Sequence, residues 1–233
     1  MTYWWNEQEA SDLKPSDIHL ADSAAIAEGK VIEKDLYPLL AQFLFSRPRK
    51  IYPKRIDEKT SSNSFGKNGN DWLHPDLVGL EDLASGWDYD IKDWTARAGA
   101  RQAKLWSFEV KSEITRSSVR KDYFQAVSNS TWGNYGYLVA VKINPDVMTE
   151  LHLLNELHGI GVILLDKDIP ADSEIRIPAR ERHDVDWGTC NRIADENKDF
   201  RKFVSLIAQF YDTRATSMKE WDIPADMLAD EKN

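Results

Sequence analysis

Residues 104–111 read KLWSFEVK, and this stretch decides the fold of the 233-residue chain. Its aromatic residues and Val110 alternate with a more polar set that includes Glu109 and Lys111. Because successive side chains of a strand point to opposite faces, the aromatic set lies on one face and the Glu109/Lys111 pair on the other. The stretch therefore predicts a β-strand that presents an acid and a lysine side by side.

Predicted helices and strands alternate on both sides of this strand. After it, apolar spacing predicts a helix over 115–130, a strand over 135–143, a helix over 146–158 and a strand over 159–166. The other predicted segments are a helix over 30–46, a strand over 50–56, a polar loop over 60–71, a strand within 72–80, an irregular hairpin or insertion over 86–101, and a last helix over 197–211. This order of elements, joined by short links, is typical of an α/β fold in which helices pack against a sheet.

Length and composition bound the organisation of the chain. With 42% apolar and 30% charged residues, it suits one domain of moderate size. We expect an N-terminal arm over 1–29, the domain over 30–213 and an acidic C-terminal tail over 214–233. The single Cys190 cannot form an internal disulfide, the N-terminus lacks a secretory pattern, and no apolar run approaches the roughly 20 residues of a membrane span. These features predict a cytoplasmic protein with no membrane partner.

The net charge of −9 excludes a protein that coats nucleic acid by bulk electrostatics. It does not exclude a local basic groove, because basic residues gather over 47–55 and again over 116–121. Ordinary solvated faces are the alternative interpretation of both clusters.

Most patterns that carry chemistry are missing from the sequence. There is no Gly-rich phosphate loop, no paired Cys/His spacing for zinc, and no pair of histidines one helical turn apart. What is left is Pro75-Asp76 together with Glu109-Val110-Lys111. An acid two residues before a lysine also occurs elsewhere, as at Asp90 and Lys92, but only Glu109 and Lys111 lie in a clean alternating strand.

Two carboxylates and a lysine in this arrangement suit the hydrolysis of a phosphodiester. Hard cations such as Mg²⁺ take oxygen ligands, which Asp76, Glu109 and the carbonyl of Val110 would supply. Lys111 would position or help to deprotonate the attacking water. A salt bridge between Glu109 and Lys111 at the end of a strand, with Asp76 as a loop acid, is the competing interpretation.

Several strings of the sequence resemble a known superfamily. Pro75-Asp76, the FEVK of residues 108–111 and the YFQAVS of residues 123–128 resemble the PD-(D/E)xK phosphodiesterases, which have the restriction-endonuclease-like fold. More narrowly, WLHPDLVG at 72–79, FQAVSNS at 124–130 and GYLVA at 136–140 are similar to a bacterial family associated with restriction and mobile-defence loci. The resemblance covers about residues 33–211.

The resemblance implies a restriction-endonuclease-like core, with a central mixed β-sheet flanked by helices. It also implies that Asp76 and Glu109, with Val110, hold Mg²⁺ or Mn²⁺ while Lys111 acts on the water. Glu33 on the first helix and Gln125 on the helix after the strand are the matching further catalytic positions. Four basic residues become candidates for contacts with nucleic acid: Lys54, Arg116, Arg120 and Lys121.

The function expected from the sequence is that of a metal-dependent DNA endonuclease in restriction or antiphage defence. Its partners would be DNA and other subunits of a defence complex, and a homodimer would allow both strands of a duplex to be cut. The first alternative is a non-catalytic nuclease-fold subunit that binds or regulates within such a complex. The second is an α/β interaction domain in which Glu109 and Lys111 form a salt bridge.

Overall fold

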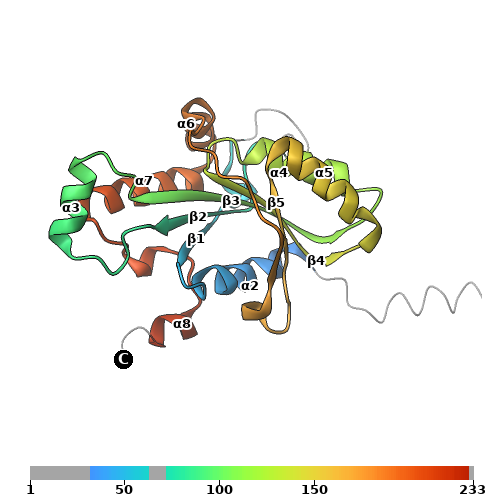
Figure 1. The fold of residues 1–233 in the computed structure, drawn as a ribbon, viewed down its shortest axis with the longest axis horizontal. Coiled ribbons are helices and arrows are strands. Elements are labelled where there is room, and N and C mark those ends of the chain that lie inside the picture. Colours follow the sequence, from blue (N-terminus) through green and yellow to red (C-terminus); the bar gives the residue numbers. More distant parts are fainter. Residues whose placement is uncertain (1–31, 63–71, 231–233) are drawn as a thin grey trace, which may run out of the picture. The chain divides into compact units, whose positions relative to one another are not determined.

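The computed structural model describes residues 32–62 and 72–230, and within them it has an α/β fold built on a six-stranded mixed sheet (Figure 1). The strands follow one another across the sheet in chain order: β1 (Ile51–Arg55), β2 (Leu77–Asp82), β3 (Ala103–Ile114), β4 (Tyr135–Ile143), β5 (Gly161–Leu164) and β6 (Glu174–Ile177). The pairs β3/β4 and β4/β5 are parallel, and the other neighbouring pairs are antiparallel. The predicted α/β fold with a mixed sheet flanked by helices is confirmed. The predicted arm over 1–29 lies outside the described residues.

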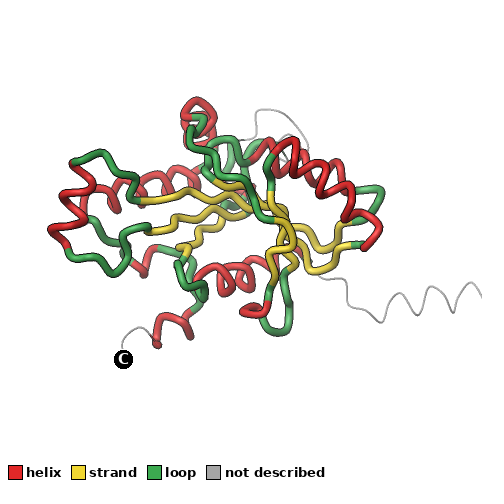
Figure 2. The backbone as a smooth tube through the Cα atoms, in the orientation of Figure 1, coloured by secondary structure: helices red, strands yellow, loops and turns green. Residues whose placement is uncertain are grey.

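Helices cover both faces of the sheet, as Figures 1 and 2 show. On one side lies α2 (Glu33–Phe45), and on the other lie α4 (Val119–Asn129), α5 (Met148–His158) and α7 (Lys198–Thr213). These four helices correspond to the four that the apolar spacing predicts. None of the helices in the described ranges is long and apolar enough to cross a membrane.

The central strand β3 is longer than its sequence pattern predicts. It runs on to Ile114, which is fully buried, and it pairs with β2 on one side and β4 on the other. Buried apolar residues along β3 pack against the flanking helices. Leu105 joins the core formed with α7, and Ile114 joins the core formed with α4 and α5.

Three further elements form where sequence patterns are weak. The predicted irregular insertion over 86–101 contains α3 (Tyr89–Arg97), and β6 and α6 (Trp187–Glu196) were not predicted. Both helices begin after a capping aspartate. The carboxylate of Asp88 accepts a hydrogen bond from the N–H of Asp90, and that of Asp186 accepts one from the N–H of Thr189.

The described part of the predicted acidic tail, 214–230, contributes to the core. Trp221 and Ile223 are buried with residues of β1 and α7, and a short helix, α8 (Ala225–Asp230), follows them. Between these two apolar residues, the N–H of Asp222 donates to the carbonyl of Pro53 on β1.

Candidate active site

The site lies where β3 extends beyond its neighbour β2. The last register pair between the two strands joins Leu77 and Phe108, so residues 109–114 of β3 pair only with β4. Asp76, directly before β2, forms two further hydrogen bonds to the backbone of β3. Its N–H donates to the carbonyl of Phe108 at 3.1 Å, and its Oδ2 accepts from the N–H of Val110 at 2.8 Å. The backbone therefore holds the Asp76 carboxylate at the open edge of β3.

A second acid reaches the same edge from α2. The carboxylate of Glu33, in the first turn of that helix, lies close enough to Lys111, Asp76 and the N–H of Ser112 for these groups to shift its pKa. Because alternate residues of a strand direct their N–H groups to the same side, the N–H groups of Val110 and Ser112 both point toward the edge that β2 leaves free. Asp76 accepts from the first of these donors, and Glu33 lies near the second.

Glu109 and Lys111 lie together on one face of β3, as the alternating pattern predicts. The ammonium Nζ of Lys111 donates to Oε1 of Glu109 at 2.8 Å. The side chain of Glu109 is only 2% exposed, whereas that of Lys111 is 16% exposed. Glu109 is therefore the buried member of the pair, and Lys111 is the member that reaches solvent.

Asn129, the last residue of α4, fixes the other oxygen of Glu109. Its Nδ2 donates to Oε2 of Glu109 at 3.0 Å. The backbone carbonyl of Asn129 is itself held, because it accepts from the hydroxyl of Ser107 on β3 and from the indole N–H of Trp132. The position of the buried carboxylate is therefore set by α4 as well as by β3.

Tyr37 orients Asp76 from the side of α2. Its hydroxyl donates to Oδ1 of Asp76 at 3.0 Å, and the guanidinium of Arg55 lies 4.9 Å from the centre of its ring. Burial and the charge of Asp76 raise the pKa of Tyr37 above its usual range, so the phenol stays protonated and serves as a donor.

The electrostatics of the site show more buried acids than the one lysine beside them can balance. Burial raises the pKa of Glu109 to about 8, with the charge of Asp76 adding to the rise and Lys111 opposing it. Burial also raises the pKa values of Asp76 and Glu33, each partly offset by Lys111. Burial alone would lower the pKa of Lys111, but the charges of Glu109 and Asp76 outweigh it and raise that pKa. Lys111 is therefore charged at neutral pH, and the acids around it outnumber it.

The donor set fits a hard divalent cation that keeps part of its water. Asp76 and Glu109 offer carboxylate oxygens, and the carbonyl of Val110 points to the same side as its N–H, toward Asp76. Within residues 32–62 and 72–230, no three His, Cys, Asp or Glu side chains form a group that would hold a metal by themselves. Water and substrate would have to supply the other ligands, which is the usual situation for Mg²⁺.

The structure brings four of the five predicted catalytic residues into this network of contacts and charges, namely Glu33, Asp76, Glu109 and Lys111. The fifth, Gln125, is buried on α4 one helical turn before Asn129.

The four residues predicted to contact nucleic acid are not part of this network. Lys54 donates to Asp222 at 2.8 Å, while Arg116 and Arg120 pair with Asp146 and Glu150 beside α5. Lys121 is exposed on α4.

Sequence reasoning missed three polar residues at the site: Tyr37, Asn129 and His74, which is among the groups that act on Asp76. Tyr37 follows Glu33 by one helical turn, and Asn129 follows Gln125 by the same interval, so helical spacing from the predicted residues was the available signal. Two of the three carry buried atoms without a hydrogen-bond partner among the described residues, Nε2 of His74 and Oδ1 of Asn129. Buried polar atoms in that condition are rare and are typical of sites that receive a ligand or water.

No protein-family model, no curated protein and no solved structure matches the chain. The function therefore has to be inferred from the contacts and charges of the site and from the sequence resemblance.

Proposed function

We propose that the chain is a metal-dependent endonuclease with a restriction-endonuclease-like core, which hydrolyses phosphodiester bonds in DNA. The observation that carries this proposal is the meeting of Asp76, Glu109 and Lys111 at the open edge of β3, with Glu33 beside them. Buried carboxylates without enough positive charge nearby are costly. A divalent cation would remove that cost, which is why the arrangement supports a metal site better than a structural one.

Asp76 and Glu109, with the carbonyl of Val110, would hold Mg²⁺ or Mn²⁺. When bound, such an ion supplies Lewis acidity toward a phosphate oxygen and lowers the pKa of water. The protein prepares this site by fixing its ligands. Tyr37 holds one oxygen of Asp76, and Asn129 holds one oxygen of Glu109, so neither carboxylate has to reorganise when a substrate arrives.

Lys111 acts as a charged donor in this proposal. Its raised pKa keeps the ammonium protonated at neutral pH, so it donates hydrogen bonds and does not accept a proton from water. Because Lys111 is the partly exposed member of the pair, it can orient the attacking water or offset the charge that develops on the phosphate. This sharpens the role expected from the sequence, in which positioning and deprotonation of the water were both open.

The ion pair between Lys111 and Glu109 is also what the competing interpretations require. A non-catalytic subunit or an interaction domain would keep the same 2.8 Å contact. Such a protein would have no need for two further acids, Asp76 and Glu33, that share the charge of Lys111. The choice of DNA as substrate, and a cytoplasmic role in restriction or antiphage defence, rest on the sequence resemblance.

A cleavage assay with a matched control tests the proposal. The chain is incubated with Mn²⁺ or Mg²⁺ and with supercoiled DNA, linear duplex, single-stranded DNA or RNA. We expect the wild type to cut DNA and Lys111→Ala to be inactive. Lys92→Ala removes a lysine with the same spacing from an acid, on α3, and we expect it to behave as the wild type. Failure of the wild type to cut any substrate, together with no binding of either ion, would favour the non-catalytic subunit.

A further inference from the structure

A second feature of the molecule adjoins the candidate active site. A cavity of about 350 Å³ lies between α2, the end of β1 and the C-terminal segment. Its lining combines basic, acidic, aromatic and apolar side chains: Lys34, Tyr37, Pro38, Ala41, Arg55, Leu77, Asp222, Ile223 and Pro224. Its volume falls in the range of pockets that hold small organic ligands.

The cavity and the acid cluster share a wall. The ring of Tyr37 lines the cavity, while its hydroxyl donates to Oδ1 of Asp76. Leu77, another lining residue, directly follows Asp76 in the chain, and Lys34 directly follows Glu33. A molecule in the cavity would therefore be next to whatever is bound at Asp76.

The guanidinium of Arg55 has a hydrogen-bond donor that could bind an anion in the cavity. Its Nε is buried and has no hydrogen-bond partner among the described residues. Its nearest ionic contact, from a terminal guanidinium nitrogen to Asp57, measures 3.7 Å, and Lys34 is 3.8 Å from Glu58. Both separations exceed hydrogen-bond length, so neither cation is saturated by these acids.

Asp222, the acid in the lining, repels a bound anion less than a carboxylate without partners would. One oxygen of Asp222 accepts from Nζ of Lys54 at 2.8 Å, and the other accepts from the N–H of Arg55 at 2.7 Å. Both of its carboxylate oxygens are therefore hydrogen-bonded to groups of β1. A guanidinium with free N–H groups is well suited to phosphate oxygens, and the remaining aromatic and apolar walls suit a planar heterocycle.

We propose that this cavity binds one nucleotide of the substrate, with its phosphate at Arg55 and its base against the walls formed by Tyr37, Pro38 and Ile223. The inference rests on the proposed function and adds to it a subsite adjacent to the scissile phosphate. The subsite would hold the substrate strand in place for the acids and Lys111, and it would select a strand with a base that can leave the stack.

Direct binding without metal tests this subsite separately from cleavage. The full chain in EDTA is titrated calorimetrically with each deoxynucleoside 5′-monophosphate and with inorganic phosphate. We expect at least one nucleotide to bind to a single saturable site, about tenfold or more tightly than phosphate, because the base buries apolar surface. Arg55→Gln should weaken nucleotide binding about tenfold through loss of a charge-assisted contact. Arg49→Gln, the same change at an exposed position, should have no effect.

A second variant tests the size of the cavity separately from its charge. Ala41→Leu narrows the cavity without changing its charge, and it should also weaken nucleotide binding. Circular dichroism confirms that each variant is folded. Absence of binding by every nucleotide, equal binding of inorganic phosphate, or binding unchanged in both Arg55→Gln and Ala41→Leu would overturn the subsite.

The two proposals fail in different ways. Nucleotide binding by a protein that never cleaves would refute the nuclease and leave a nucleotide site. Cleavage by the wild type that Arg55→Gln leaves unchanged, without nucleotide binding, would refute the subsite alone.

Discussion

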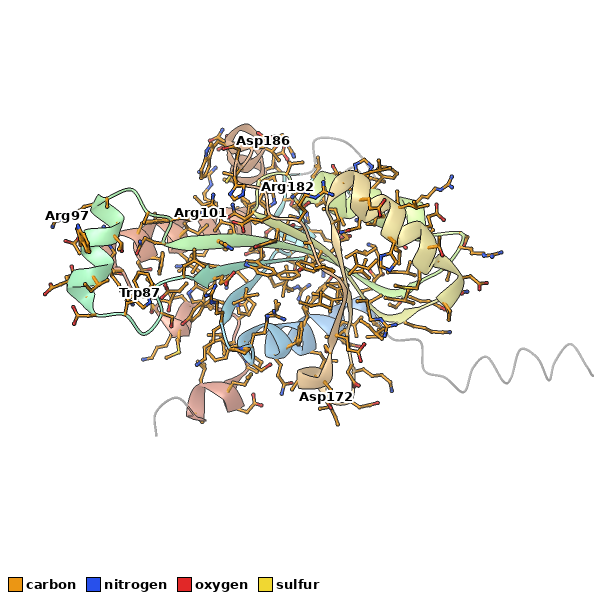
Figure 3. All side chains as sticks on the ribbon, viewed as in Figure 1. Trp87, Arg97, Arg101, Asp172, Arg182 and Asp186 are labelled. Atoms are coloured by element: carbon orange, nitrogen blue, oxygen red, sulfur yellow. The ribbon has the colours of Figure 1, made fainter. Side chains whose placement is uncertain are left out.

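The two ends of the β2/β3 pair differ in how their acidic side chains are grouped. At one end, Asp76 and Glu109 are held by backbone and side-chain hydrogen bonds in surroundings that raise their pKa values. At the other end, α3 joins the strands, and none of its residues is buried. Trp87 and Arg97 mark this end in Figure 3. Glu81 and Asp82 are buried near this end as well, but only the acids of the first end are shown to act on each other, since the charge of Asp76 raises the pKa of Glu109. The aromatic residues of α3 are exposed.

The comparison indicates at which end of the β2/β3 pair side chains are held in position before any ligand binds. The exposed aromatic residues near α3, such as Tyr89 at 62% and Trp94 at 67%, touch little, so the packing of the sheet hardly depends on them. The acids at the opposite end are each oriented by at least one named donor, although their burial is unfavourable. A group of acids held together in this way at a free-energy cost is suited to precise chemistry.

The largest expected effect is the loss of activity in Asp76→Asn. The substitution keeps the shape and one acceptor oxygen but removes the charge that would bind the metal. Cleavage should fall about a thousandfold or more, as it does when a catalytic residue is removed from other hydrolases. The rate is measured on the DNA substrate that the wild type cuts best. Asp90→Asn changes an exposed acid on α3 and should keep the wild-type rate; equal rates in the two variants would break the comparison between the two ends.

A smaller effect is expected from Asn129→Ala, which frees Oε2 of Glu109. Residues that orient metal ligands typically contribute 10- to 100-fold to affinity or activity, and we expect a loss of about that size in Mn²⁺ affinity and in cleavage rate. Mn²⁺ binding is followed by titration calorimetry. Asn191→Ala, at an exposed position on α6, is the control. Unchanged Mn²⁺ affinity in Asn129→Ala would mean that β3 alone positions Glu109.

The pH dependence of stability tests the burial of Glu109. Its folded-state pKa of about 8 lies above the ordinary value of 4.5, so between these pH values the folded protein keeps a proton that the unfolded chain loses. Wild-type stability should therefore fall as the pH rises through this window. Relative to the wild type, Glu109→Gln should gain about 3.5 kcal/mol in free energy of unfolding from pH 5 to pH 8.

Urea unfolding at several pH values measures this difference. Glu113→Gln removes a more exposed acid of the same strand and should show no such gain. Added Mn²⁺ should stabilise the wild type at pH 8 and should stabilise Glu109→Gln less. A difference between Glu109→Gln and wild type that is independent of pH would contradict the raised pKa.

The smallest effect is expected at α3. Tyr89→Ser and Trp94→Ser should change the free energy of unfolding by less than about 0.5 kcal/mol, the usual range for exposed positions. Urea unfolding and the cleavage rate are the measurements. A destabilisation above about 1 kcal/mol, which is typical of buried side chains, would show that these residues pack more closely than their exposure indicates.

The main elements and most of the site could be predicted because their signals are local. The alternation over 104–111 places Glu109 and Lys111 on one face, and apolar spacing marks the four helices that cover the sheet. α3 escaped prediction because its helix has no apolar face to bury, and a single capping residue, Asp88, gives little sequence signal.

The orienting contacts could not be predicted because they are long-range. The bond from Tyr37 to Asp76 depends on how α2 sits against the sheet. That from Asn129 to Glu109 depends on where α4 ends. The engagement of Lys54 by Asp222 depends on the return of the C-terminal segment to β1, which no spacing within the sequence reports.

The C-terminal segment around Asp222 also covers one edge of the sheet, the free side of β1. β1 is an outer strand, and its unpaired backbone groups would ordinarily be a template for another strand. Asp222 takes the outward carbonyl of Pro53 with its N–H and the outward N–H of Arg55 with its carboxylate. Proline itself offers no donor. Two copies of the chain therefore cannot join their sheets through β1 while this segment is in place, and self-association by strand addition at this boundary is blocked.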